Sequence, residues 1–465
     1  MSFKKSVQDY FPYTLTTENA NQALISDKDH LLLIGTQKDN RYICELIETG
    51  RISVGADAEG YSLACIDSPW HKGRRVVVIA GNDPSGVIYG VSEFNSHVLS
   101  TAIAPNEPAQ YRNAFDKIQD FQIRERPMIT NRGIWSWGYV IYDYKRFIDN
   151  MARLRLNMLT IWNDCPPANC REIIQYAHSR GVKIVLGFPY GWGNKEIDLA
   201  NKQDQERVKI ETLDDFHRNY LDLGMDGIYI QTLTERTDME IGGKSIAGLA
   251  CDWVNGLAEL LYNECPNLYF QWGIHAPSIL GNYREFERLD PRVVLVWEDA
   301  GVIPYSYNPV TTYNDNLPPH AKAAVLGSVE STAEYSIKLA SSRGKMEFGM
   351  VAKGFIWLPW ESEFEHHGPF ILGERSSDFV RSRFELRKKR WEMVNALWAR
   401  NYPAAASFYR RILDCNPSRM TVSALIEDGM FEESIQSSVA LFANTLWNPR
   451  VDDIELQARA VASCR

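Results

Sequence analysis

Met158-Leu-Thr-Ile-Trp-Asn-Asp164, Lys183-Ile-Val-Leu-Gly-Phe-Pro-Tyr190 and Gly227-Ile-Tyr-Ile-Gln-Thr-Leu-Thr-Glu235 are the stretches that decide the fold of this chain. Each is a short, mostly apolar run that ends in polar or aromatic residues. Each also follows a segment with the apolar spacing of an amphipathic helix. Apolar strands that alternate with helices are typical of a parallel sheet buried on both faces. The pattern therefore predicts an α/β fold.

Five further runs complete the pattern. They are Gly133-Ile-Trp-Ser-Trp137, Leu268-Tyr-Phe-Gln-Trp-Gly-Ile-His275, Val293-Val-Leu-Val-Trp-Glu-Asp299, Gly354-Phe-Ile-Trp-Leu-Pro-Trp-Glu361 and, as a weakly marked seventh strand, Ala323-Ala-Val-Leu-Gly327. Eight such strands predict a (β/α)8 TIM barrel, whose chemically active side chains gather at the carboxyl ends of the strands. The first interpretation is an enzyme that acts on a polyhydroxylated substrate.

The sequence predicts three regions. Residues 1–125 contain two strand-like runs and two helical patterns, which indicate a small α+β domain with a connector at its end. Residues 126–375 are expected to form the barrel, and residues 376–465 a helical C-terminal region without strands. This last region offers a surface for a homodimer, although packing on its own barrel would give the same pattern.

Composition excludes several classes of protein. The chain has 465 residues and a net charge of -9, with no run of Lys and Arg, so a nucleic-acid partner is not expected. No uninterrupted apolar segment approaches the ~18 residues of a membrane span, and the N-terminus has no secretory signal pattern. We therefore expect a cytoplasmic protein with no membrane partner. Its eight scattered cysteines are typical of reduced thiols.

Three motifs resemble a known group of enzymes. They are Gly81-Asn-Asp-Pro-Ser-Gly-Val-Ile-Tyr-Gly-Val-Ser-Glu-Phe94, Asn131-Arg-Gly-Ile-Trp-Ser-Trp137 and Leu154-Arg-Leu-Asn-Met-Leu-Thr-Ile-Trp-Asn-Asp164. Together they are similar to the small domain and first two barrel strands of family 67 alpha-glucuronidases and family 20 hexosaminidases. The resemblance covers roughly residues 75–375. It implies an exo-acting glycoside hydrolase that cleaves a small oligosaccharide or glycoside and needs no cofactor.

The resemblance also implies a general acid at the end of the fourth strand, which is Glu235 here. Family 20 enzymes carry an Asp-Glu pair at this place, whereas this chain has Thr234-Glu235. That departure disfavours substrate-assisted cleavage of N-acetylhexosaminides. It favours an inverting, glucuronidase-like site or a relative with a different substrate.

Acids at the ends of other predicted strands supply a partner for Glu235. Glycoside hydrolysis needs one acid to protonate the leaving oxygen and a second carboxylate to act as base or nucleophile. Glu298 and Asp299 are adjacent at the end of the sixth strand, and strand alternation sends only one of them inward. We favour Asp299 narrowly over Glu298. Glu361 is a further acid at a strand end.

Polar and aromatic residues near the strand ends are candidates for contact with the sugar, because sugar faces stack on aromatic rings and hydroxyl groups need polar partners. The candidates are Arg132, Trp137, Trp162, Asp164, His275, Trp360 and Glu361. The adjacent His366 and His367 do not favour a metal site, because neighbouring histidines cannot easily bind one ion from one face.

Other functions remain open at this point. They are a beta-N-acetylhexosaminidase-like enzyme and a non-catalytic carbohydrate-binding barrel, which would keep the tryptophans without needing the acids. A barrel lyase or isomerase would require a catalytic Lys or a metal cluster at the strand ends, and the sequence displays neither there.

Overall fold

The computed structural model describes most of the chain. The described residues are 15–25, 30–95, 118–163, 165–188, 197–231, 234, 238–275, 278–298, 329–355, 369–373 and 377–464, with Lys4, Val7 and Gln8. They divide into two compact units. One comprises residues 1–128, 152–155 and 458–465, and the other comprises residues 129–151 and 156–457.

The larger unit is a closed barrel of eight parallel strands, which confirms the predicted (β/α)8 fold. In the order in which they neighbour one another, the strands are β11 (Tyr269–Ile274), β12 (Val294–Trp297), β13 (Phe348–Ala352), β14 (Met420–Leu425), β5 (Asn131–Trp137), β6 (Met158–Trp162), β7 (Lys183–Gly187) and β8 (Gly227–Gln231). The last strand in the sequence, β14, pairs with the first, β5, and closes the barrel.

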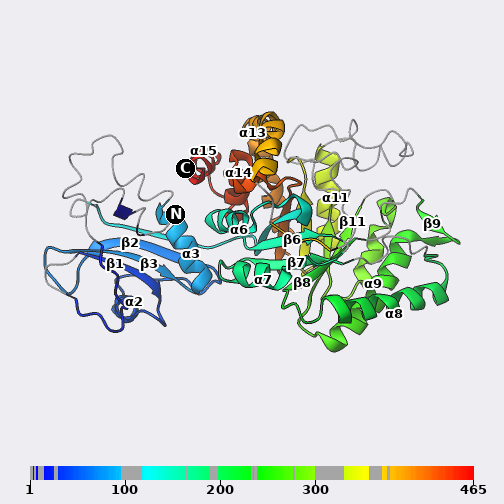
Figure 1. Ribbon diagram of the computed structural model, residues 1–465, viewed down its shortest axis with the longest axis horizontal. Coiled ribbons are helices and arrows are strands. Elements are labelled where there is room, and N and C mark those ends of the chain that lie inside the picture. Colours follow the sequence, from blue (N-terminus) through cyan, green and yellow to red (C-terminus); the bar gives the residue numbers. More distant parts are fainter. Residues whose placement is uncertain are drawn as a thin grey trace. The chain divides into compact units, whose positions relative to one another are not determined.

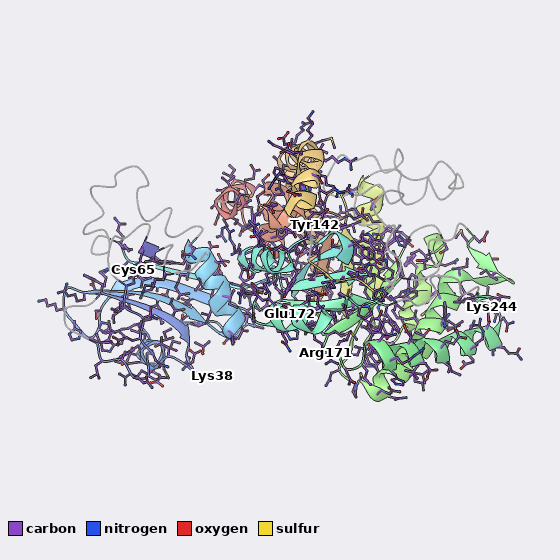
Figure 2. All side chains as sticks on the ribbon, viewed as in Figure 1. Lys38, Cys65, Tyr142, Arg171, Glu172 and Lys244 are labelled. Atoms are coloured by element: carbon purple, nitrogen blue, oxygen red, sulfur yellow. The ribbon has the colours of Figure 1, made fainter. Side chains whose placement is uncertain are left out.

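Helices connect and flank these strands. They are α6 (Tyr144–Arg153), α7 (Cys170–His178), α8 (Lys202–Asn219), α9 (Ile246–Glu264), the 3-10 helix η5 (Leu280–Arg288), α11 (Val329–Ser342), α13 (Ser377–Asp414) and α14 (Ser437–Trp447). A further helix, α15 (Asp453–Ser463), follows α14 in the sequence. Figure 1 shows α8 and α9 side by side on the outside of the barrel, in green. Glu172 in the first turn of α7, labelled in Figure 2, accepts a hydrogen bond from the Tyr144 hydroxyl of α6 at 2.6 Å. Two short antiparallel strands, β9 (Glu240–Ile241) and β10 (Lys244–Ser245), precede α9.

One predicted barrel strand was misplaced. The prediction put a strand at residues 354–361, but the structure places β13 at Phe348–Ala352, and Gly354 has a left-handed backbone with φ of +87°. The other candidate, residues 323–327, lies outside the described residues, as do residues 356–361. The barrel also extends beyond residue 375, because its eighth strand lies in the region that was predicted to be wholly helical.

The smaller unit contains a four-stranded sheet with the order β1-β3-β2-β4. Its elements are β1 (Leu31–Thr36), α2 (Arg41–Glu48), β2 (Tyr61–Asp67), β3 (Arg75–Gly81), α3 (Pro84–Glu93) and β4 (Phe121–Glu125). Helix α2 packs its apolar face, Ile43 and Leu46, against Val76 and Val78 of the sheet (Figure 1). The predicted α+β layer is present. The prediction missed β2, and it treated β4 as part of a connector.

Polar side chains fill the amino end of the barrel interior. Asn131 of β5 donates to Thr421 of β14 (2.9 Å) and to Glu347 before β13 (3.2 Å), and it accepts from Lys183 of β7 (3.0 Å). The Tyr269 hydroxyl of β11 also bonds to Glu347. The amino end of the barrel interior is therefore filled by polar side chains that bond to one another.

No helix among the described residues is both long and apolar enough to cross a membrane.

Candidate active site

The carboxyl ends of the barrel strands bring together a set of inward-facing polar and aromatic side chains. Strand alternation places them, because every second residue of a barrel strand faces the interior. On β12 the inward positions are Val294 and Val296, both in the interior apolar cluster, and the next one is Glu298. The same alternation leads to Gln231 on β8, His275 after β11 and Lys353 after β13.

Glu298 is the best-defined functional group of this end. Its side chain is 6% exposed, and both of its oxygens have partners. Oε1 accepts a hydrogen bond from the Tyr229 hydroxyl at 2.5 Å, and Oε2 accepts one from the Gln231 amide at 2.7 Å. His275 Nε2 lies 2.9 Å from Oε2. A carboxylate so close to Nε2 favours the tautomer that carries hydrogen on that nitrogen.

These neighbours keep Glu298 ionised. Burial alone would raise the pKa of the Glu298 carboxyl group, because it disfavours the charged form. The charges of His275 and Lys353, together with the hydrogen bonds from His275 and Tyr229, outweigh this effect. The net result is a pKa below the ordinary glutamate value. Glu298 is therefore a carboxylate at neutral pH, which is the form that a base or a nucleophile requires.

Gly273 of β11 provides the space for this arrangement. A Cβ atom at position 273 would lie 1.9 Å from Glu298 Oε1 and 2.3 Å from the Tyr229 hydroxyl. Both distances are far shorter than any real carbon contact. Residue 273 must therefore be glycine, because the Tyr229 hydroxyl and the Glu298 carboxylate occupy the space that a side chain would need.

Aromatic rings form a floor beneath the acids. Trp135 stacks on Trp162, with ring centroids 5.9 Å apart and planes at 21°. The ring of Trp137 stands edge-on to both, at centroid distances of 5.7 Å and 6.4 Å. Tyr229 contacts Trp162 at 5.8 Å and links this floor to Glu298. Aromatic rings beside polar groups combine apolar surface with hydrogen-bonding groups, and a sugar ring needs both.

The missed strand β14 carries a further acid to this end. Glu427 is buried and accepts a hydrogen bond from Trp137 Nε1 at 3.2 Å. The next residue, Asp428, lies 3.4 Å from Arg387 and accepts from Trp391 Nε1 at 3.2 Å, both in α13. Glu427 was not among the site residues predicted from the sequence. The signal that could have found it is the alternation Thr421, Ser423, Leu425 before a Glu-Asp pair.

Some of the predicted site residues are brought together. Glu298, His275, Trp137 and Trp162 all lie at the carboxyl end of the barrel. Glu235, Asp299, Asp164, Trp360 and Glu361 lie outside the described residues.

Arg132 is misplaced as a substrate-binding candidate. It lies near the amino end of β5, is fully buried, and donates hydrogen bonds to the carbonyl groups of Ile129 (2.7 Å) and Thr130 (3.0 Å). Its guanidinium group packs on the Trp447 ring of α14 at 5.1 Å. Because alternation turns Arg132 away from the barrel interior, its role is structural.

Comparison with known proteins identifies no family. No family model matches the chain, and no curated protein matches it. The similar solved structures include CpGH84B (14% identity, 99% of this chain, 68% of that chain, TM-score 0.49) and a GH20 exo beta-N-acetylglucosaminidase from Vibrio harveyi (10%, 99%, 70%, 0.48). Another is a chitobiase from Flavobacterium johnsoniae (11%, 87%, 59%, 0.47). At these identities and TM-scores the likeness assigns neither residues nor activity.

Proposed function

We propose that this protein is a glycoside hydrolase that cleaves a small oligosaccharide or glycoside from its end, at the carboxyl end of the barrel. The observation that carries the proposal is the buried, ionised carboxylate of Glu298, beside the aromatic floor of Trp135, Trp137 and Trp162. An ionised carboxylate is one of the two acid groups that glycosidic bond cleavage needs.

The two acids take different roles in this proposal. Glu298 acts as the base that activates water or as the nucleophile that attacks the anomeric carbon, since its lowered pKa keeps it charged. Glu235 acts as the general acid that protonates the leaving oxygen. It follows β8 closely, and β8 also supplies Gln231 and Tyr229 to Glu298. Asp299 is the alternative partner for Glu235.

The site chemistry gives His275 and Lys353 supporting roles. Both favour the charged form of Glu298, and His275 also orients its Oε2 oxygen through a hydrogen bond. His275 is itself held by a hydrogen bond from its backbone nitrogen to the Thr234 hydroxyl at 2.8 Å. Thr234 directly precedes Glu235, the proposed general acid. This hydrogen bond therefore connects the end of β8 with the end of β11, which carries His275.

Two alternatives stand beside the proposal. A beta-N-acetylhexosaminidase-like enzyme would use the acetamido group of its substrate as the nucleophile, and it would then hydrolyse only N-acetylhexosaminides. A non-catalytic carbohydrate-binding barrel would bind sugars on the same tryptophan floor and hydrolyse none. Substrate selectivity therefore separates the first alternative from the proposal, and turnover separates the second.

The test is hydrolysis of a panel of aryl glycosides by the wild-type protein and by Glu298→Gln and Glu235→Gln variants. The panel covers α- and β-linked neutral sugars, N-acetylhexosaminides and glucuronides. Each variant should lose at least ~10²-fold in kcat, the low end expected for loss of an acid or base. Glu347→Gln is the matched control, because it removes a partly buried, hydrogen-bonded carboxylate at the amino end of the same barrel. It should retain kcat.

Three outcomes would contradict parts of the proposal. Full activity in Glu298→Gln would remove Glu298 from the chemistry and favour Asp299. Full activity in Glu235→Gln would remove the assigned general acid. Sugar binding without turnover of any glycoside would favour the binding protein.

A further inference from the structure

The side chain of Glu298 crosses one strand of the barrel to reach its partners. Glu298 follows β12, but two of its hydrogen-bond donors, Tyr229 and Gln231, belong to β8, and β11 lies between these two strands. The crossing is open because β11 carries Gly273, where a side chain would collide with Glu298 and with the Tyr229 hydroxyl. The carboxylate therefore lies beside the end of β8.

Gln231 faces the interior at that end. Tyr229 belongs to the interior apolar cluster, and Gln231 lies two residues further along the same strand, so strand alternation turns both to the same side. Gln231 is the last residue of β8 and is 8% exposed. Its neighbour in register on β11 is Gly273, so the neighbouring residue places no side chain between Gln231 and Glu298.

The contacts of Gln231 identify its two amide atoms. The atom 2.7 Å from Glu298 Oε2 is the nitrogen, because an ionised carboxylate only accepts hydrogen bonds. The same nitrogen lies 2.9 Å from His275 Nε2, so both side chains approach Oε2. Gln231 Oε1 makes no hydrogen bond to a described residue, and it is not among the described polar atoms that are buried without a partner. Oε1 is therefore an acceptor that is open to solvent.

The same contacts leave a lone pair on Glu298 for the reaction. Oε2 accepts from Gln231 and lies against His275, whereas Oε1 accepts from the Tyr229 hydroxyl among the described residues. Each carboxylate oxygen can accept two hydrogen bonds. The second lone pair of Oε1 can therefore attack an anomeric carbon or take a proton from water.

Covalent geometry keeps Gln231 Oε1 close to this reaction. The oxygen and nitrogen of an amide are about 2.3 Å apart, so Gln231 Oε1 lies at most about 5 Å from Glu298 Oε2. When a sugar presents its anomeric carbon to Glu298, the nearest ring substituent that can donate a hydrogen bond is the one on the neighbouring carbon, C2. A hydroxyl group or the N–H of an acetamido group would suit an amide oxygen there.

We propose that Gln231 is a specificity-determining residue, whose Oε1 accepts a hydrogen bond from the group on C2 of the sugar while its Nε2 holds Glu298. The inference rests on the proposed function and narrows its substrates to glycosides with a hydroxyl or acetamido group at C2. A 2-deoxy sugar would displace water from Oε1 and leave this acceptor unpaired, which costs binding free energy.

The first test compares kcat/KM for aryl glycosides that differ only at C2, where they carry a hydroxyl group, an acetamido group or hydrogen. Gln231→Met keeps the length of the side chain and removes both amide atoms. The readout is the ratio of kcat/KM between each C2-donor substrate and its 2-deoxy counterpart, because a purely structural loss lowers both values equally. Tyr229→Phe is the matched control, since it removes another hydrogen bond to Glu298 but no amide oxygen.

This ratio should fall about fivefold to a hundredfold from wild type to Gln231→Met, the range expected when a buried acceptor is left unpaired. It should stay unchanged in Tyr229→Phe, although both variants lower kcat. The different intrinsic reactivities of the substrates cancel in this comparison. A ratio that falls for the hydroxyl substrate alone identifies a hydroxyl group as the donor, and one that falls for the acetamido substrate alone identifies the acetamido N–H.

The second test needs no turnover. Isothermal titration calorimetry compares glucose and N-acetylglucosamine with 2-deoxyglucose, and galactose with 2-deoxygalactose. Wild type should bind at least one C2-donor sugar about fivefold or more tightly than its 2-deoxy counterpart. Gln231→Met should bind the two alike.

The two tests separate this inference from the proposed function. An unchanged ratio in folded Gln231→Met would overturn the role of Gln231, as would wild-type protein that binds each pair equally or binds none of the sugars. A binding preference that disappears in Gln231→Met would support the role even if no glycoside is hydrolysed. That last result would contradict only the proposed function.

Discussion

The carboxylate of Glu298 is charged although it lies in the barrel interior. Its hydrogen-bond partners come from β8 and from the end of β11, and the charge of Lys353 after β13 also lowers the pKa of Glu298. In the proposed mechanism the acidic limb of the pH–activity profile reports protonation of Glu298. That limb should therefore lie below the ordinary glutamate pKa.

Replacement of Lys353 by methionine should move this limb. The substitution keeps an unbranched side chain that is one atom shorter, and it removes one of the charges that lower the pKa of Glu298. The pKa of Glu298 should rise, so the acidic limb of kcat/KM should shift to higher pH. Lys338→Met on the exposed face of α11 is the control. If the acidic limb of kcat/KM does not move, a group other than Glu298 causes it.

Gly273 gives a second prediction for a single residue. A methyl group at this position cannot fit between Glu298 and the Tyr229 hydroxyl. Gly273→Ala should displace Glu298 and lower kcat at least ~10²-fold, because small misplacements of a catalytic group are costly. Gly281→Ala, at a position with open space around it, is the matched control. Retained kcat in Gly273→Ala would show that the position of Glu298 does not matter for turnover.

Strand alternation could have decided between Glu298 and Asp299 if the strand bounds had been known. The inward positions Val294 and Val296 lead to Glu298, but in an all-apolar strand the sequence does not reveal which face is inward. Arg132 was misplaced for a related reason. Its position at the beginning of β5 puts it at the amino end of the barrel, and only the strand bounds reveal that.

At the level of elements, hydrogen bonds connect the segment after β14 with the segment after β5. Glu432, at the end of the 3-10 helix η8 (Gly429–Glu432), accepts a hydrogen bond from the backbone nitrogen of Tyr142, labelled in Figure 2, at 3.0 Å. The Asn150 side chain donates to the carbonyl groups of Phe431 and Glu432. Burial raises the pKa of Glu432 to about 8. This contact therefore depends on pH.

The sign of that dependence follows from linkage. The pKa of Glu432 is higher in the folded protein than in the unfolded chain, so folding favours the protonated acid. Its contribution to stability is complete below the unfolded value near 4.5 and is lost as pH rises towards about 8. Urea unfolding at pH 5, 6.5 and 8 should show this decline. Glu432→Gln, which cannot ionise, should flatten it, whereas Glu259→Gln on the exposed face of α9 should not. An equally steep decline of stability in Glu432→Gln would show that another group causes the pH dependence.

The sequence predicted the first six barrel strands better than the last two, β13 and β14. Six of the eight strands follow clear apolar runs, and the structure has a strand within each of them. Strand β13, Phe348-Gly-Met-Val-Ala352, is short and contains glycine, whereas the aromatic run after it looks more like a strand. Strand β14 carries Thr421 and Ser423 on its inward positions, so it lacks the continuous apolar character expected of a buried strand.

At the scale of the whole molecule, the barrel depends on residues far from its other strands in the sequence. A chain truncated after residue 416 would keep seven barrel strands and all of α13 but lose β14 and α14. It should not form a cooperatively folded barrel, because β5 and β13 would each lose β14, the strand with which they pair. A chain truncated after residue 452 keeps all eight strands and should unfold cooperatively in circular dichroism. A cooperative transition in the shorter chain would contradict the role of β14 as the closing strand.

The late position of β14 also bears on how the protein is made. During synthesis, β13 leaves the ribosome well before β14, because the 38-residue helix α13 lies between them. At the usual ~5–20 residues per second the nascent chain spends several seconds with two open sheet edges. Such edges pair readily with other chains. Recombinant yield should therefore depend on growth temperature and on chaperones that bind nascent chains, even though the finished barrel has no exposed edge.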